Sequence, residues 1–178
     1  WKREFWALRD VSFDAMPGDL IGIIGRNGSG KTTLLRALAG IIGVDAGRIR
    51  VAGRIACLMS FGVGFNPRLT GRENIYLSAT MLGLQHREID AAIDDIIAFS
   101  ELGDFIAAPV ATYSKGMRVR LGFAIAIHIS PDVLLLDEVL TAGDEGFRAK
   151  AGNIIERMRA DSRTIVVASH DMAMLQRL

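Results

Sequence analysis

The stretch Leu20-Ile21-Gly22-Ile23-Ile24-Gly25-Arg26-Asn27-Gly28-Ser29-Gly30-Lys31-Thr32 decides the fold. Its first five residues are apolar and mostly branched, which predicts a buried strand of a parallel sheet. The next eight match the full pattern of a phosphate-binding loop, G-x-x-x-x-G-K-T. Residues 31–39 favour a helix that stops at Gly40. Strand, loop and helix in this order are the setting that the pattern requires.

The residue types of this loop suit the binding of a nucleoside triphosphate. Glycines let backbone N–H groups turn toward phosphate oxygens, and the N-terminus of the following helix favours an anion. We expect Lys31 to reach the terminal phosphates and Thr32 to ligate Mg²⁺, so that ATP and Mg²⁺ are the expected cofactors. The alternative is a glycine-rich turn that binds nothing. The predicted nucleotide contacts in the loop are Gly25, Asn27, Gly28, Ser29, Gly30, Lys31, Thr32 and Thr33.

Length and composition predict one compact domain over residues 1–178, because 178 residues with 50% apolar side chains can bury a single sizeable core. Lys and Arg number 21 against 20 Asp and Glu, so the net charge of +1 gives no electrostatic footprint for nucleic acid. The longest apolar runs fall short of the roughly 20 residues of a membrane-spanning helix. Any membrane association is therefore expected through a partner. The chain lacks a starting methionine and stops within an expected helix, so we expect truncation at both ends.

The rest of the chain alternates strand and helix patterns, which predicts an α/β fold. A capping box, Thr70-Gly71-Arg72-Glu73, marks one helix start, and apolar residues at Ile89, Ile93, Ile96 and Ile97 recur at helical spacing. We expect helices at 70–82, around 89–97 and at 114–128, strands at 133–136 and 164–168, and two short strands with a turn near Gly53 within 48–59.

A second chemical signal is the apolar strand Asp132-Val133-Leu134-Leu135-Leu136-Asp137-Glu138, which ends in two adjacent carboxylates. It resembles the Walker B element of P-loop ATPases. Asp137 would hold Mg²⁺, directly or through water, and Glu138 would polarise the attacking water as a general base. The alternative is a solvated acidic strand end.

Three further sites complete a set of motifs in the order found in ABC ATPases. Residues 112–118, TYSKGMR, stand where that family carries its signature sequence, with Ser114 and Gly116 matching and Lys115 and Met117 departing from the commonest residues. His170 follows an apolar strand, and Asp144 comes seven residues after Asp137. The chain therefore resembles an ABC nucleotide-binding domain over nearly its whole length.

That resemblance implies a P-loop fold with a mostly parallel core sheet, an antiparallel β portion and a helical subdomain at about 70–130. It also implies roles. Ser114 and Gly116 would face phosphates bound to the opposite subunit, although Ser114 also reads as a simple helix N-cap. His170 would contact the γ-phosphate, or be a satisfied strand-end histidine. Asp144 would be the D-loop aspartate that couples the two sites of a dimer.

Several positions stay open. The family's Q-loop glutamine is missing between residues 58 and 65, and Ser60 is the candidate to align with it. Trp1, Phe5 and Trp6 could stack on adenine, and the alternative is that two of them are core aromatics. His86 and His128 lack a functional setting, and the lone Cys57 is interpreted as core filler.

Residues 5–13, 62–76 and 113–117 resemble ATPases that export cell-surface polysaccharide such as O-antigen, capsule polymer and teichoic acid. This implies a head-to-tail dimer with ATP between the subunits, and an integral membrane permease contacted by residues 61–70. The location would be the cytoplasmic face of the bacterial inner membrane. The alternative is a non-transport ABC ATPase of a nucleic-acid or ribosome-associated complex, and a degenerate P-loop scaffold is disfavoured because Lys31, Asp137, Glu138 and His170 are all present.

Overall fold

The central element is a sheet of four parallel strands. The computed structural model describes residues 5–59, 64–138 and 144–176. The strands lie in the order β1 (Leu20–Ile24), β4 (Thr164–Ser169), β3 (Val133–Asp137) and β2 (Ile55–Leu58). All six residues of β4 are buried, as expected for a strand with neighbours on both edges and layers on both faces. The carboxyl ends of β1, β3 and β4 share one edge of the sheet, where ligands bind in open α/β sheets.

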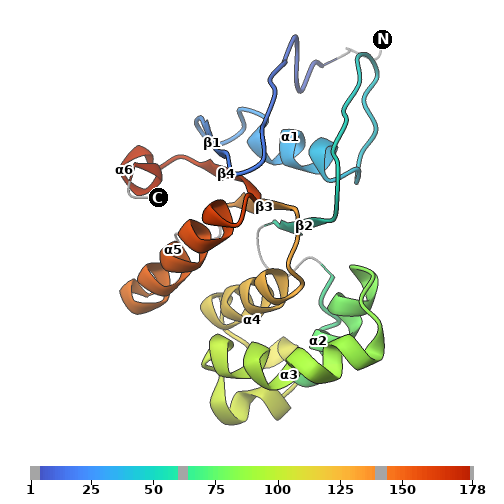
Figure 1. Cartoon of the computed structure of the whole chain (residues 1–178), viewed down its shortest axis with the longest axis vertical. Helices are drawn as coiled ribbons and strands as arrows, with labels where there is room; N and C mark the ends of the chain where they lie inside the picture. Colours follow the sequence, from blue (N-terminus) through green and yellow to red (C-terminus); the bar gives the residue numbers. More distant parts are fainter. Residues whose placement is uncertain (1–4, 60–63, 139–143, 177–178) are drawn as a thin grey trace.

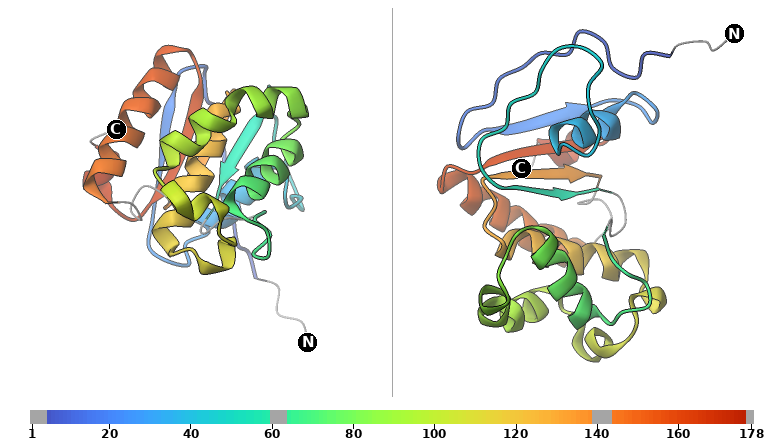
Figure 2. Two further views of the ribbon diagram at one scale, coloured as in Figure 1. Left: turned by 90° about the horizontal axis from the view of Figure 1, so that it is seen from below. Right: turned by 90° about the vertical axis from the view of Figure 1, so that its right-hand side faces the viewer.

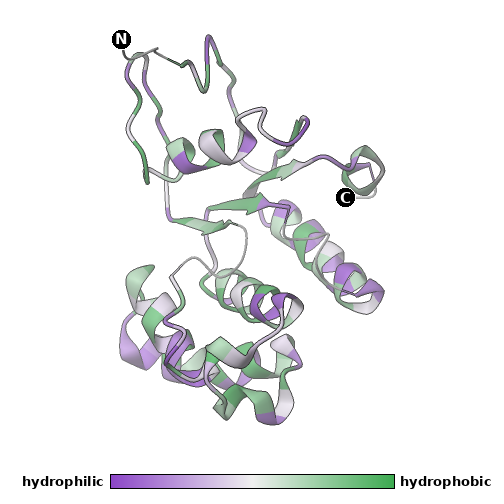
Figure 3. Ribbon diagram, turned by 180° about the vertical axis from the view of Figure 1, so that it is seen from behind, coloured by the Kyte–Doolittle hydropathy of each residue, from purple (hydrophilic) through white to green (hydrophobic). Residues whose placement is uncertain are grey.

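Helices cover both faces of this sheet (Figure 2). On one face α1 (Lys31–Leu38) buries Leu35 against Leu135 and Val166. On the other face α4 (Lys115–His128) and α5 (Glu145–Ala160) share a core in which Phe123 and Phe147 are fully enclosed. The short α6 (Met172–Leu175) packs on β4. Hydropathy colouring shows the strands hydrophobic along most of their length and the helices mixed (Figure 3).

A second hydrophobic core lies among the helices below the sheet in Figure 1. Here α2 (Gly71–Met81) and α3 (His86–Ser100) pack on α4, followed along the chain by 3-10 turns at Gly103–Ala107 and Val110–Thr112. The predicted amphipathic helix is confirmed, because Ile89, Ile93 and Ile96 are buried in this core. Ile97 is half-buried at its margin.

The predicted helix starts are confirmed by their caps. The Thr70 hydroxyl accepts from the N–H of Glu73 at 3.2 Å, and the Glu73 carboxylate accepts from the N–H of Thr70 at 2.8 Å. These bonds satisfy N–H groups that a helix leaves unpaired at its start. At α4 the Ser114 hydroxyl accepts from the N–H of Met117 at 3.2 Å.

The loop before α2 is tied to the segment before α4. The N–H of Val110 donates to the carbonyl of Leu69, and that of Ala111 to Pro67, each at 2.9 Å. Thr70 and Pro109 form an isolated antiparallel bridge. Residues 66–70 and 108–113 are therefore joined through their backbones, and Ser114 follows directly. We call this contact the backbone strap.

The expected antiparallel β portion is not seen in the described residues, where every strand pairing in the sheet is parallel. Of the two strands expected within 48–59, only β2 forms. Gly53 does turn, with φ 92°, but residues 41–50 are exposed throughout. Residues 48–52 alternate in a strand-like way, yet a strand needs a neighbour for its N–H and C=O groups, and no described segment pairs with them.

None of the helices in the described ranges combines the length and the apolar character that crossing a bilayer demands.

Candidate functional site: a phosphate-binding loop at the sheet edge

The loop between β1 and α1 is shaped by glycines. Gly28 and Gly30 have φ values of 82° and 95°, a left-handed region that side chains disfavour. A Cβ on Gly30 would lie 2.8 Å from the carbonyl oxygen of Ala7, and one on Gly25 would lie 2.4 Å from the Ser29 hydroxyl. The loop therefore folds this tightly only without side chains at these positions.

This loop borders a cavity of about 340 Å³, large enough for a ligand. The cavity brings together most of the loop residues predicted from the sequence and both carboxylates at the end of β3. Its lining is Phe5, Ala7, Asn27, Gly28, Gly30, Lys31, Thr32, Thr33, Asp137 and Glu138. Gly25 and Ser29 lie in the same loop and shape its turn without lining the cavity.

The Lys31 ammonium folds back over the loop. Its Nζ donates to the carbonyl oxygen of Gly25 at 2.8 Å and to that of Arg26 at 3.2 Å, and lies 3.7 Å from Oε1 of Glu138. Only 7% of the side chain is exposed. The positive charge of Lys31 is therefore held at the cavity wall by two backbone carbonyls. An anionic ligand could take the place of these carbonyls as the partner of Lys31.

Thr32 and Asp137 meet across the site although they are distant in sequence. The Thr32 hydroxyl donates to Oδ2 of Asp137 at 2.6 Å, and Asp137 is 2% exposed. A hydroxyl and a carboxylate are the oxygen ligands that Mg²⁺ prefers, and Mg²⁺ commonly keeps waters and substrate phosphates as its other ligands. These two residues therefore fit the expected ion.

Glu138 and His170 form the second polar pair. Nδ1 of His170 lies 2.9 Å from Oε1 of Glu138. The backbone of Glu138 is left-handed, with φ 53°, and its N–H donates to the carbonyl of Ala168 at 2.9 Å, so the turn after β3 is anchored to β4. Backbone strain of this kind is concentrated at functional sites.

The surroundings of Glu138 favour its charged form. The hydrogen bond with His170 is the largest influence that lowers the pKa of Glu138, with smaller contributions from the charges of His170 and Lys31. Partial burial opposes this effect. The carboxylate is thus ionised at neutral pH, as a proton acceptor must be.

Ser114 and Gly116 do not line this cavity. They stand at the start of α4, on the opposite face of the sheet from α1 (Figure 1). The Ser114 side chain is exposed, so it is open to another molecule while it caps its own helix. A single chain therefore does not bring the predicted signature residues to its own phosphate-binding loop.

Asp144 also lies away from the cavity lining, as the N-cap of α5. Its Oδ1 accepts from the N–H of Phe147 at 2.9 Å, and its Oδ2 accepts from the Arg120 guanidinium. The contact with Arg120 was not predicted, because residues 24 positions apart leave no local sequence pattern.

The aromatic residues near the start differ from the expected core pair. Phe5 is 89% exposed and Trp6 is 58% exposed. Phe5 is one of the residues that line the cavity, which makes it the candidate among the described aromatic residues for contact with a base. Trp1 and Ser60 lie outside the described residues.

The residues interpreted as structural have structural contacts. The His86 ring packs against Tyr76 at 5.5 Å between centroids, and Nδ1 of His128 lies 2.7 Å from the carbonyl oxygen of Ala124. Burial, with a smaller effect of the Asp137 charge, raises the pKa of the Cys57 thiol to about 11. The thiol is therefore neutral and unreactive at physiological pH.

Comparison with curated proteins gives close relatives over almost the whole chain. The O-antigen export system ATP-binding protein RfbB of Klebsiella pneumoniae is 44% identical over 176 residues, which are 99% of this chain and 72% of that protein. The teichoic acids export ATP-binding protein TagH of Enterococcus faecalis is 47% identical over 174 residues. These cover 98% of this chain but 39% of that relative. Relatives of this kind thus contain further sequence.

Solved structures share the fold. An ATP-binding subunit of an ABC transporter aligns with a TM-score of 0.86 and 23% identity, covering 96% of this chain and 76% of the other. A dimeric ATP-binding cassette, described as a post-hydrolysis state with ADP and phosphate, aligns with a TM-score of 0.87 and 21% identity over 99% of this chain and 85% of the other. The sequence model of the ABC transporter family matches residues 8–141. With that match and relatives at 44–47% identity, the chain belongs to the ABC transporter family as one of its ATPase domains.

Proposed function

We propose that this chain is the ATP-hydrolysing subunit of an exporter that moves a cell-surface polysaccharide or a related polymer across the bacterial inner membrane. The observation that carries the proposal is the convergence of Lys31, Thr32, Asp137 and Glu138 on one cavity, with His170 bonded to Glu138. The similarity to O-antigen and teichoic acid export proteins supports the polymer as cargo.

In this proposal each residue at the cavity has a distinct task. When ATP binds, Lys31 exchanges the carbonyls of Gly25 and Arg26 for phosphate oxygens. The phosphate oxygens are charged acceptors, so their hydrogen bonds with the ammonium group are stronger than those of the neutral carbonyls. Thr32 and Asp137 hold Mg²⁺, which supplies charge neutralisation on the phosphates. The remaining contacts with phosphate come from the N–H groups of the loop and of the start of α1.

Glu138 is the proposed general base. Its carboxylate accepts a proton from a water molecule while the water oxygen attacks the γ-phosphorus and the bond to the β-phosphate bridging oxygen breaks, giving ADP and inorganic phosphate. His170 orients the carboxylate through the 2.9 Å contact and keeps it ionised. In this proposal His170 also contacts the γ-phosphate once ATP is bound.

A second copy of the chain completes the proposed site. Ser114 and Gly116 lie away from their own loop, and Ser114 is an exposed residue at the N-terminus of a helix, the end that favours an anion. In a head-to-tail pair these groups of one subunit would cover the ATP bound to the other. Asp144, at the start of α5, would lie near that interface.

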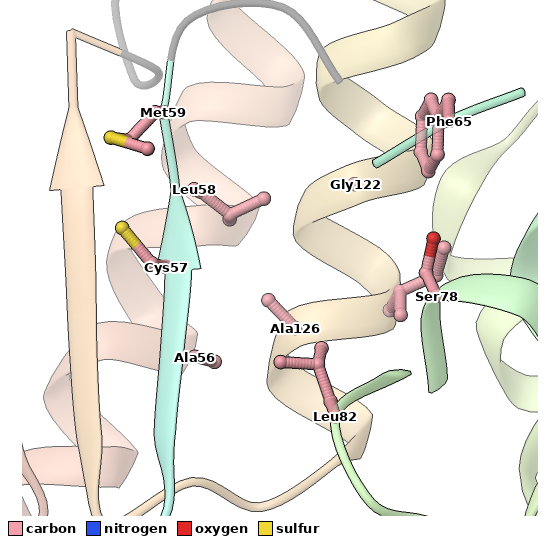
Figure 4. Close-up of a pocket in the computed structure, with 10 residues that line it drawn as sticks. Ala56, Cys57, Leu58, Met59, Phe65, Ser78, Leu82, Gly122 and Ala126 are labelled. Atoms are coloured by element: carbon pink, nitrogen blue, oxygen red, sulfur yellow. The ribbon is translucent and has the colours of Figure 1, made fainter. Parts of the chain in front are cut away.

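The proposed contact with the integral membrane permease is the loop at residues 61–70, of which 64–70 are described. Beside it lies a cavity of about 50 Å³ between β2, α2 and α4, lined in part by Leu58, Phe65 and Leu82 (Figure 4). The Ser78 hydroxyl is buried there, without a hydrogen-bond partner among the described residues. Docking of the permease here would place the subunit at the cytoplasmic face of the membrane.

The test is the molar mass of the Glu138→Gln protein in solution, with and without ATP and Mg²⁺. We expect a shift from monomer to dimer that depends on ATP, because the variant binds nucleotide but cannot activate water. Its turnover should fall by more than about a hundredfold. Lys31→Ala should show neither dimer nor turnover. A well-folded wild-type protein that binds no ATP would overturn the proposal.

A variant in the loop tests the permease contact. Phe65→Asp should reduce co-purification with the permease while ATP binding by the isolated subunit stays at the wild-type level. Unchanged co-purification would exclude this loop as the contact.

A further inference from the structure

A network of charged side chains joins the helical cluster to α5. Arg120, on α4, donates from Nη1 to Oε2 of Glu101 at 3.0 Å and from Nη2 to Oδ2 of Asp144. Its guanidinium also lies over the ring of Phe147, 5.5 Å from the centroid. Only 19% of the Arg120 side chain is exposed. The guanidinium plane is therefore fixed by two carboxylates and an aromatic face, a geometry that lysine cannot reproduce.

Each oxygen of the Asp144 carboxylate accepts a hydrogen bond from a group of its own chain, and 60% of the side chain stays exposed. Oδ1 caps α5 through the N–H of Phe147, and Oδ2 accepts from Arg120. The cap is the largest influence that lowers the pKa of Asp144, followed by the charge of Arg120. The side chain is therefore ionised and contacts both α4, through Arg120, and α5, through Phe147.

Aromatic rings pack at the junction of α3, α4 and α5. The rings of Phe123 on α4 and Phe147 on α5 lie 5.7 Å apart at 77°, an edge-to-face pair. Phe99, from the end of α3, contacts both of them. The three rings therefore join α3, α4 and the start of α5 in one packed cluster.

The position of the pair in the chain connects two parts of the proposed site. Arg120 lies six residues after Ser114 on the same helix, about 9 Å along its axis. Asp144 lies six residues after Glu138 in sequence. The contact thus joins the helix that begins at the signature to the helix that follows the proposed general base.

We propose that Arg120 is a positioning residue for ATP hydrolysis, which fixes Asp144 and the start of α5 relative to the signature helix. The inference rests on the proposed function and deepens it. Arg120 does not line the nucleotide cavity, so it acts through Asp144 and not on ATP. Removal of the Arg120 side chain leaves the phosphate-binding loop intact. It allows Asp144 and the start of α5 to shift relative to the signature helix, and so disturbs how the second subunit is placed against Glu138.

The experiment compares two variants of the full-length protein with its permease. Arg120→Met removes the contact with Asp144. Lys150→Met is the matched control, because Lys150 donates to Glu101 at 2.8 Å in the same network but does not touch Asp144. We expect Arg120→Met to lower kcat by about tenfold to a hundredfold, the scale of a small misplacement of catalytic groups. ATP affinity, measured by titration with a fluorescent ATP analogue, should stay within twofold of wild type.

The control should keep kcat within about twofold of wild type even if both variants melt at a similarly lower temperature. Arg120→Lys should fall between wild type and Arg120→Met. Asp144→Asn keeps an oxygen to cap α5 but loses the ionic partner, so combining it with Arg120→Met should lower kcat no further than the more severe single variant.

Three results would overturn the inference: equal kcat losses in Arg120→Met and Lys150→Met, weakened ATP binding as the sole defect, or losses that multiply in the double variant. Absence of ATP turnover in the wild-type protein is a different outcome. It would overturn the proposed function itself, and with it the reaction that Arg120 serves.

Discussion

The Cα of Gly71 faces the side chain of Tyr113 so closely that a Cβ at residue 71 would lie 2.2 Å from the tyrosine hydroxyl oxygen. That hydroxyl donates to the carbonyl of Phe105 at 2.6 Å, and only 3% of Tyr113 is exposed. The start of α2 and the residue before the signature serine therefore pack without space between them.

Gly71→Ala is expected to destabilise the protein by about 1–3 kcal/mol, because an added methyl group in a packed site forces its neighbours to move. Gly152→Ala is the control with the opposite sign. Gly152 lies inside α5 with open space around its Cβ position, so alanine should stabilise by about 0.5–1 kcal/mol. Urea unfolding of both variants measures the difference, and equal effects would contradict the packing seen at Gly71.

Asn74→Ala is expected to cost about 2–3 kcal/mol of unfolding free energy, because its loss leaves buried backbone groups unpaired. Asn74 is fully buried, and its Oδ1 accepts from the N–H of Asn66 at 2.7 Å. Its Nδ2 donates to the carbonyls of Asn66, Leu69 and Thr70 at 2.9–3.1 Å. Arg72→Ala, on the exposed side of the same helix, should change stability by less than about 0.5 kcal/mol in the same denaturation assay. A similar loss of unfolding free energy in Asn74→Ala and Arg72→Ala would contradict the role given to the buried Asn74 amide.

The contact between Lys150 and Glu101 predicts a stability difference that depends on pH. The hydrogen bond from Lys150 is the largest influence that holds the pKa of Glu101 below its usual value of 4.5. A depressed pKa in the folded state means that the unfolded state binds more protons, so the stabilisation is complete above about pH 4.5 and is lost as pH falls through the folded-state value.

Lys150→Met should therefore lower the melting temperature by about 2 °C at pH 7. The difference in melting temperature between Lys150→Met and the wild type should become smaller near pH 3. Melting curves at several pH values test this, and 1 M NaCl should reduce the gap at pH 7 by screening. A gap that is constant from pH 7 to pH 3 would show that the ion pair contributes nothing.

Cys57 predicts slow alkylation of the folded protein. It is the single cysteine of the chain, and burial raises its pKa from 9.0 to about 11. At pH 8 the folded protein then holds about a hundredfold less thiolate than the unfolded chain, and thiolate is the reactive form. Iodoacetamide labelling followed by mass spectrometry should be slower by at least about that factor before unfolding in guanidinium. Equal rates in the two states would contradict the burial of the thiol.

Local chemistry explains which features could be predicted from the sequence. The loop Gly25 to Thr32 and the capping box at Thr70 are specified by residues a few positions apart, and the structure has the local geometry that each requires. The carboxylates at 137 and 138 could be placed at the site because parallel strands end at one edge. The cap at Ser114 was equally local.

The features that could not be predicted depend on distant partners. Residues 48–52 have a strand pattern but no described neighbour to pair with. Phe5 and Trp6 look like core residues by composition, whereas their exposure depends on what lies beside them. The contact between Arg120 and Asp144 joins residues whose spacing carries no periodic signal, so only the folded chain reveals it.

The backbone strap limits how this domain can be recombined with its relatives. Consider a chimaera that takes residues 64–76 from another exporter but keeps residues 108–113. The two sides of its backbone strap then come from different proteins. The carbonyls at positions 67 and 69 then belong to the foreign segment, while the N–H groups of Val110 and Ala111 that donate to them are native. The foreign residue at 71 must also leave room for Tyr113. An exchange of residues 64–113 keeps both sides of the backbone strap, and the contact between Gly71 and Tyr113, within one parent protein.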